Sequence, residues 1–139
     1  MPLCAPGSRL SERFTSVGSA PAEAVGAQVR RVIAAAAAPD IASQRRQSQR
    51  IAFPQLLRLQ AVDPLTLVPQ DESLVVVGRF LSEQGLGFFH QEPMPHRFVV
   101  VSIDVPGDAP TRLLLDVSWC RFTRHGWYES GGRFLRVAE

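Results

Sequence analysis

Three arginines in residues 44–50, which read QRRQSQR, are the residues whose type and spacing most clearly suggest chemistry. Arg46 and Arg50 are four positions apart, and Arg45 stands beside them. A planar guanidinium can bind phosphate through two parallel hydrogen bonds, pair with O6 and N7 of guanine, or stack on a purine ring. The cluster fits a nucleotide that carries phosphates and guanines, and its composition also fits a basic linker exposed to solvent.

A second feature is the segment FLSEQGLGF, residues 80–88. Ser82 is a good turn residue, and its hydroxyl can donate a hydrogen bond to a ligand or accept one from it. Gly85 can adopt a positive φ or allow a ligand to approach the backbone closely. Taken alone, the segment predicts an ordinary β-hairpin.

Signals for catalysis or metal binding are missing from the sequence. Ser82 and Ser118 have no histidine nearby, and neither a GxSxG nor a GxGxxG motif occurs. The chain has no lysine, so a phosphate-binding GxxxxGK loop is impossible. The two cysteines and three histidines lack metal-ligand spacing, and we expect His90 and His96 to be solvated loop residues. We therefore predict neither an enzyme nor a cofactor or metal site.

One amphipathic helix is predicted over residues 21–38. Its apolar residues recur at helical spacing, at Val25, Val29, Val32, Ile33 and Ala36. Pro21 suits the first turn of a helix, and Pro39 ends the pattern. The narrow apolar stripe could pack on the rest of the domain or on a partner helix, and the first is commoner. Residues 1–20 are rich in Ser, Gly and Pro, which predicts a flexible tail.

The rest of the chain is predicted to form strands. Ten of the eleven aromatic residues follow residue 50, so the packed core should begin near Ile51. Strands are expected over 51–62, 74–80, 86–90, 98–105, 111–122 and 127–137, the last interrupted by Gly131 and Gly132. We expect Trp119 and Phe134 to be buried on facing strands. Strands of this length, joined by short Gly/Pro loops, indicate an antiparallel sandwich or barrel.

Length and charge narrow the function classes further. A chain of 139 residues with 45% hydrophobic and 20% charged residues is typical of one globular domain. No apolar run approaches the ~18 residues of a membrane span, and the first residues lack a signal-peptide pattern, so we expect a cytoplasmic protein. Residues 1–50 carry a charge of +4 and residues 51–139 a charge of −2. Because residues 51–139 carry a net negative charge, we expect that neither nucleic acid nor a membrane is a partner.

The arginine cluster and the turn, in this order, resemble the two motifs of the PilZ domain family. The RxxxR motif of that family is matched by Arg46 and Arg50, with its common preceding arginine at Arg45. Its [D/N]xSxxG motif is matched at Ser82 and Gly85.

The C-terminal part strengthens the resemblance. Residues 115–137, LDVSWCRFTRHGWYESGGRFLRV, are similar to the closing hairpin of PilZ domains, and the resemblance spans about residues 44–138. It implies a small six-stranded antiparallel β-barrel over residues 44–139. Residues 21–43 would then form an N-terminal helix and linker, and residues 1–20 the flexible tail.

The resemblance also implies a ligand, the bacterial second messenger cyclic di-GMP. Arg45, Arg46 and Arg50 would grip its phosphates and guanines, and Ser82 and Gly85 would line the opposite side. The chain departs from the family at the Asp or Asn position of the second motif, which is Phe80. A phenylalanine cannot accept the hydrogen bonds of guanine, a loss of roughly 1.5–3 kcal/mol, although stacking on a base can recover about 1–3 kcal/mol.

Two functions follow from these features. The intact RxxxR motif favours a cyclic di-GMP receptor that changes its contact with an effector protein when the ligand binds. Phe80 favours a degenerate PilZ domain that acts without ligand as a protein–protein adaptor in pilus, flagellar or exopolysaccharide machinery. A different kind of β-barrel binding protein is the remaining alternative.

Overall fold

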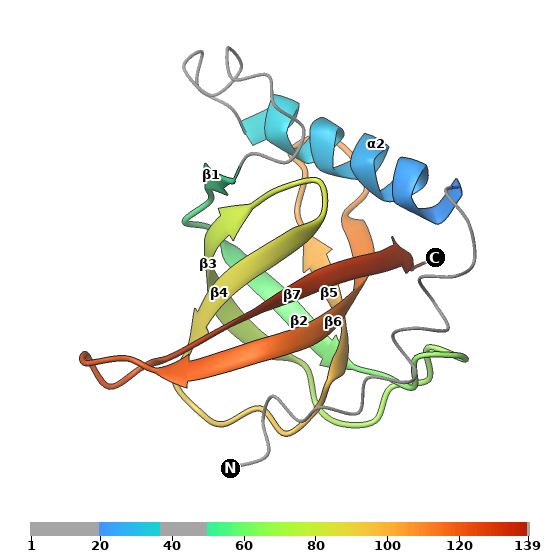
Figure 1. Cartoon of the computed structure of the whole chain (residues 1–139). Coiled ribbons are helices and arrows are strands. Elements are labelled where there is room, and N and C mark those ends of the chain that lie inside the picture. The colour runs from blue at the N-terminus through green and yellow to red at the C-terminus, as the bar shows by residue number, and fades with distance from the viewer. Residues whose placement is uncertain (1–19, 37–49, 139) are drawn as a thin grey trace.

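The computed structural model describes residues 20–36 and 50–138. Helix α2 (Ala20–Ala36) is followed by seven strands: β1 (Ile51–Ala52), β2 (Leu56–Ala61), β3 (Leu74–Leu81), β4 (Gly85–His90), β5 (Phe98–Ile103), β6 (Thr111–Phe122) and β7 (Tyr128–Val137). The predicted tail lies outside the described residues except for Ala20, and so do Arg45 and Arg46. The helix and strands lie close to their predicted ranges (Figure 1).

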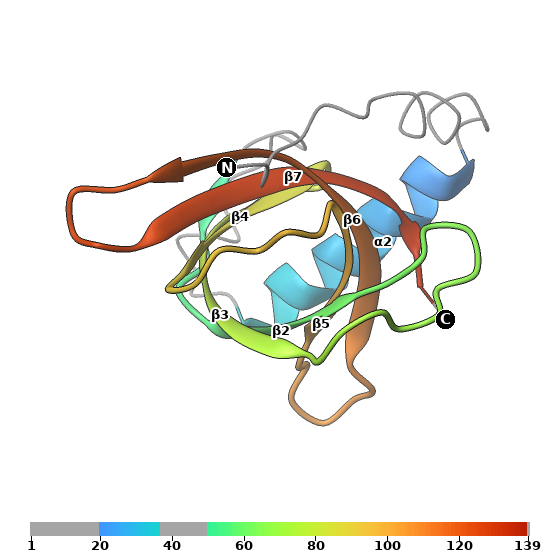
Figure 2. The same ribbon diagram turned by 90° about the horizontal axis from the view of Figure 1, so that it is seen from below.

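All strand pairs are antiparallel, and six strands close into a barrel. The order is β1-β3-β2-β5-β6-β7-β4, and β4 returns to pair with β3. Viewed from below, the strands surround a common interior (Figure 2). Strand β1 adds only a two-residue edge to β3, through Ile51 opposite Leu81 and Ala52 opposite Phe80. The predicted six-stranded antiparallel β-barrel is therefore confirmed.

The single strand predicted over residues 51–62 is two strands, β1 and β2. Pro54 has no backbone N–H to contribute to a ladder. Around it the chain makes a tight local turn, in which the amide of Gln55 donates to the carbonyl of Phe53 over 2.8 Å. Both strands then pair with β3, so the interruption places Arg50 and β1 beside the far end of β3.

The barrel interior is filled by the alternate, inward-facing residues of each strand. Its fully buried members include Leu57, Leu59, Leu81, Leu86, Phe88, Val101, Leu113 and Leu115. Phe134 on β7 joins this core with 8% of its surface exposed, as predicted. Trp119 on β6 is only partly buried, so the prediction of a buried Trp119 is wrong. Its ring lies at a surface pocket described below.

Helix α2 lies across one open end of the barrel (Figure 1). Val25, Val29 and Val32 are buried in the same core as the strands, which confirms packing on the domain. Two ion pairs fix the helix at its sides: Arg30 contacts Glu83 over 2.9 Å, and Arg31 contacts Asp108 over 2.6 Å. No helix within the described part of the chain is both long and apolar enough to cross a bilayer.

His90, at the end of β4, is buried to 1% exposure, so the expectation of a solvated loop histidine is wrong. Its Nδ1 lies 2.7 Å from the carbonyl oxygen of Glu92, and its Nε2 lies 2.8 Å from Oγ of Ser130. Because a carbonyl only accepts, Nδ1 carries the proton and Nε2 accepts from the serine hydroxyl. The imidazole ring also stacks on Tyr128. The arrangement holds a neutral histidine.

Protein stability should fall as the pH drops below about 6.5, the pKa of histidine in an unfolded chain. Burial lowers the pKa of His90 in the fold, and the Glu92 carbonyl only partly opposes this. Between the lowered pKa and about 6.5, the unfolded chain binds the extra proton, so acid favours unfolding. Thermal melts from pH 7.5 to 5.5 test this, with His90→Gln as the control. An equally steep pH dependence in that variant would contradict the assignment.

Candidate functional site

A pocket of about 300 Å³ lies on the barrel wall where β3, β4, β6 and β7 meet the start of β1. It is lined by Arg50, Phe80, Ser82, Gln84, Gly85, Ser118, Trp119, Gly132 and Arg133. Three of the five predicted ligand residues, Arg50, Ser82 and Gly85, are thus brought together. Arg45 and Arg46 lie outside the described residues. We call this the Arg50 pocket.

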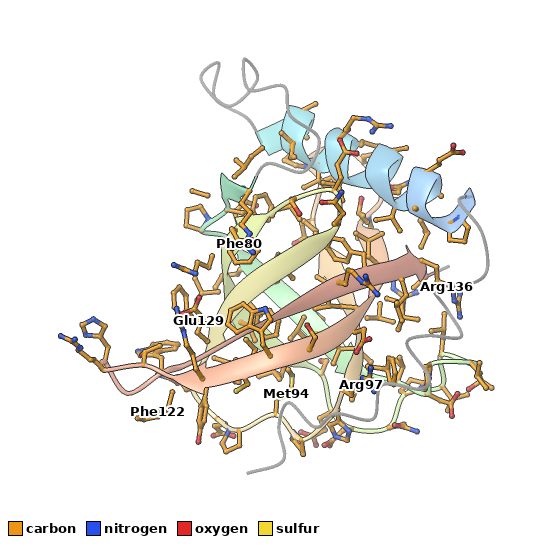
Figure 3. All side chains as sticks on the ribbon, viewed as in Figure 1. Phe80, Met94, Arg97, Phe122, Glu129 and Arg136 are labelled. Atoms are coloured by element: carbon orange, nitrogen blue, oxygen red, sulfur yellow. The ribbon has the colours of Figure 1, made fainter. Side chains whose placement is uncertain are left out.

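Phe80 forms one part of the pocket floor. Its neighbour Leu81 points into the core, so Phe80 points outward, and its ring lies on Gly87 of β4. A Cβ atom at position 87 would come within 2.3 Å of the Phe80 ring, which explains the glycine. The guanidinium carbon of Arg50 lies 4.4 Å from the ring centroid, a cation–π contact. Figure 3 shows Phe80 beside β1 and β3 near the α2 end of the barrel.

Trp119 forms a second part of the floor, on the neighbouring strands. Its indole lies on Gly131, where a Cβ atom would come within 2.5 Å of the ring. Gly131 is the register partner of Gly87, so the two aromatic rings cover adjacent positions on β7 and β4. The Arg50 pocket therefore offers two flat apolar surfaces side by side in the sheet.

The same geometry explains why β7 is not interrupted. We expected a break at Gly131 and Gly132, but the strand continues from Tyr128 to Val137. A Cβ atom at Gly132 would lie 1.9 Å from the carbonyl oxygen of Asp116 on β6. The glycines allow close approach of a ring and of a neighbouring strand, and the prediction of an interrupted strand is wrong.

Ser82 and Gly85 shape the β3–β4 turn. The Ser82 hydroxyl oxygen accepts hydrogen bonds from the amides of Gly85 and Gln84, over 3.1 and 3.2 Å. Gly85 does not take a positive φ, because among the described glycines only Gly107 and Gly126 do. A Cβ atom at Gly85 would lie 2.2 Å from the carbonyl oxygen of Gly132, so strand packing requires the glycine. Contact of Ser82 or Gly85 with a ligand stays a prediction.

The pocket is electropositive. Arg50 and Arg133 are exposed at its edge, and none of the described residues that line it is acidic. Glu83 lies in the turn but pairs with Arg30 of α2. Glu129 on β7 is 3% exposed and is held by Arg79, and by Arg121 over 2.9 Å. A positively charged pocket with two aromatic surfaces suits an aromatic molecule that carries phosphate.

Two other cavities have the opposite charge. One of about 260 Å³ is lined by Asp71, Glu72 and Glu92, among others. Another of about 430 Å³ lies beside α2 and is lined by Asp104 and Asp108. Carboxylates repel phosphate, so the chemistry of an anionic ligand favours the smaller but basic Arg50 pocket over this larger cavity.

Sequence reasoning missed Trp119 and Arg133 as pocket residues. Trp119 was expected in the core because aromatic side chains bury the largest areas. A glycine pair in the facing strand is the signal that could have placed the indole at the surface, since Gly131 leaves room for a ring that lies flat. Arg133 had no distinguishing signal, because all fifteen basic residues of the chain are arginines.

No protein-family model and no curated protein matches the chain. Among solved structures, it is similar to the Bacillus subtilis inhibitor of motility, MotI/DgrA, a PilZ-domain protein. The TM-score is 0.53 at 13% sequence identity, and the match covers 68% of this chain and 44% of that chain. This chain thus matches less than half the length of that protein, and the likeness concerns the fold alone. The strand order and this likeness give the described part of the chain a PilZ-like fold.

Proposed function

We propose that this protein is a receptor that binds cyclic di-GMP in the Arg50 pocket. The observation that carries the proposal is that residues from both PilZ-like motifs line one pocket. Arg50, the last residue of RxxxR, stacks on Phe80 beside the Ser82–Gly85 turn, in a pocket without acidic lining residues among those described. A cyclic dinucleotide has two phosphates and two purine rings, which match the guanidinium groups and the aromatic surfaces of this site.

The roles follow from the chemistry of each group. Arg50 and Arg133 bind phosphate oxygens through charge-assisted hydrogen bonds. Trp119 receives one purine ring, and Phe80 receives the other when the Arg50 guanidinium leaves its face for a phosphate. Arg45 and Arg46, on the segment that leads to Arg50, supply the further guanidinium groups that the motif implies. No step of bond making or breaking is involved, and the proposed activity is binding.

The β3–β4 turn offers a route from ligand to effector. Ser82, Gln84 and Gly85 face the pocket, while Glu83 pairs with Arg30 of α2. A ligand that shifts the turn changes how α2 packs on the barrel. The effector protein would then meet a changed surface on α2. Hydrogen exchange of α2 with and without ligand tests this coupling, and unchanged exchange in a ligand-bound protein would refute it.

Titration calorimetry of the full chain with cyclic di-GMP tests the proposal directly. The chain has two tryptophans, so Trp119 is the sole tryptophan fluorophore in a Trp127→Phe variant, and excitation at a wavelength that tyrosine does not absorb reports on it alone. We expect saturable heat and a saturable change in Trp119 emission with the same Kd. If neither signal is seen at millimolar ligand, the protein is not a cyclic di-GMP receptor.

A ligand-independent adaptor is the second candidate, and Phe80 is the observation that favours it. The loss of the polar residue at this position removes a hydrogen-bonding group that the family motif provides. The similar solved structure is an inhibitor of motility, which suggests flagellar or related machinery as the setting. A folded protein that binds no cyclic di-GMP but still binds an effector protein would favour this candidate.

A further inference from the structure

We infer that Arg79 of β3 and Arg121 of β6 form a second phosphate-binding edge of the Arg50 pocket. The inference rests on the proposed function and assigns phosphate contacts to residues that neither sequence motif includes. Both arginines hold the buried carboxylate of Glu129 on β7, and we call these three residues the Glu129 cluster. The two phosphates of the ligand then bind on opposite sides of the aromatic floor of the pocket.

Alternation along β7 places the Glu129 cluster beside this floor. Glu129 and Gly131 lie on the outer face, because Ser130 between them is buried and bonds into the barrel interior. Arg133 lines the pocket on the same face, and the Trp119 ring rests on Gly131. Two residues of a strand span about 7 Å, so Glu129 and Arg133 lie on opposite sides of Gly131, each about 7 Å away along β7. Arg133 is at one edge of the floor, and the cluster is at the other.

Each arginine of the cluster adjoins one of the two rings of the floor. Arg121 follows Trp119 by two residues on β6, and both lie opposite outward positions of β7. Arg79 directly precedes Phe80 on β3, and its guanidinium carbon lies 5.9 Å from the centroid of the Phe80 ring. Figure 3 shows Phe80 and Glu129 on the same side of the barrel, with Phe80 nearer to α2. A purine stacked on either ring therefore lies beside an arginine of the cluster.

Glu129 holds both guanidinium groups in place. Its side chain is 3% exposed, and a buried carboxylate is tolerated when it is paired and hydrogen-bonded. Nη1 of Arg79 donates to Oε2, while Nε and Nη2 of Arg121 donate to Oε1 over 3.1 and 2.9 Å. Two positive charges against one negative charge leave a net charge of +1. The cluster is therefore a fixed, positively charged group beside the floor.

Both arginines retain donors for an anion. Their side chains are 44% and 65% exposed. A guanidinium carries five N–H donors, and within the described part of the chain those of Arg79 and Arg121 bond to no side chain other than Glu129. The remaining N–H groups can bind phosphate oxygens while the ion pairs stay intact. Because Glu129 already orients the guanidinium groups, binding costs less side-chain entropy than it would with freely moving arginines.

A cyclic dinucleotide suits a site with two basic edges, because its ring contains two phosphates. Arg50 and Arg133 bind one phosphate, and the Glu129 cluster binds the other across the floor. If the cluster were only an ion-pair network that supports the sheet, its arginines would affect stability without a specific effect on ligand affinity.

Titration of the full chain with cyclic di-GMP tests the inference in the variants Arg79→Gln and Arg121→Gln. Each variant loses a charge-assisted contact, so we expect the Kd to rise about ten- to hundredfold. Arg58→Gln removes an exposed arginine of β2 outside the cluster, and this matched control should leave the Kd unchanged. An unchanged Kd in both Arg79→Gln and Arg121→Gln would overturn the inference and leave the proposed function standing. Absence of binding by the unmodified protein would overturn both.

Glu129→Gln separates ligand contact from support of the sheet. This variant keeps both arginines and removes the negative charge between them, so the Kd for cyclic di-GMP should stay the same or fall. A structural role predicts the opposite, because both guanidinium groups lose their shared partner. If Glu129→Gln weakens binding as much as Arg79→Gln does, the inference is wrong.

Thermal melts check that each variant folds. In either arginine variant, Glu129 keeps one of its two arginine partners. If Arg79→Gln nevertheless fails to fold, the double variant Arg79→Gln/Glu129→Gln removes the buried carboxylate together with this partner. Its Kd should exceed that of Glu129→Gln by about tenfold or more, and equal values would overturn the inference.

Discussion

Replacing Arg50 with alanine is expected to raise the Kd for cyclic di-GMP more than a hundredfold, while the melting temperature barely changes. The proposed complex loses a bidentate, charge-assisted contact and the stacked guanidinium. In the free protein, Arg50 is exposed and its contact with Phe80 is worth about 0.5–1 kcal/mol. Calorimetry and a thermal melt on the same sample measure both quantities. Arg46→Ala should give the same loss.

Two further variants make the Arg50 result specific. Arg50→Lys keeps the charge but loses the planar fork, so it should also bind poorly. Arg58→Ala removes an exposed arginine of β2 that does not line the Arg50 pocket, and it should bind like the unmodified protein. If Arg50→Ala binds cyclic di-GMP with unchanged affinity, the Arg50 pocket is not the binding site.

Truncation of Phe134 to alanine is expected to lower the free energy of unfolding by about 3–5 kcal/mol. Phe134 is 8% exposed and belongs to the main core of the barrel. Removing its ring leaves a cavity that the paired strands cannot close, and the loss is close to the whole stability of a small domain. Urea denaturation followed by circular dichroism measures the change.

Phe122 offers a matched control for that experiment. It is 63% exposed and lies on the β6–β7 hairpin, away from the barrel core (Figure 3). Its ring contacts Tyr128 edge to face, with centroids 5.1 Å apart, a contact worth about 0.5–1.5 kcal/mol. Phe122→Ala should therefore cost much less than Phe134→Ala. Equal losses in the two variants would mean that Phe134 does not support the core as its burial indicates.

Local patterns in the sequence identified the helix and the strands, whereas the six-stranded barrel was expected from the family resemblance. Valines at helical spacing identified α2, and apolar runs between Gly/Pro turns identified the strands. Both patterns depend on neighbouring residues, because helical and strand periodicity are properties of a short segment. Pro54 is a signal that the strand prediction did not use. A proline indicates the edge or the end of a strand, and the structure divides the predicted strand into β1 and β2 at this point.

Sequence patterns and the family resemblance predicted only part of the candidate site. The two motifs placed Arg50, Ser82 and Gly85 in one region because the resemblance specified their order. The sequence alone did not reveal that Ser82 and Gly85 serve the turn and the packing of β7. Those roles depend on the distance to Gly132, which lies far along the chain.

Cross-strand register decided what the sequence left open. Period-two alternation identifies the face of the sheet on which a side chain lies, but not the residue beside it on the next strand. Pairing of Gly87 with Gly131 makes room for Phe80 and Trp119 to lie flat, so Trp119, which was expected in the core, forms the floor of a pocket together with Phe80. Closure of the barrel buried His90 against Ser130 in the same way. The sequence determined the elements and the motif residues, whereas contacts between distant strands required the tertiary structure, because register brings together residues that no local pattern relates.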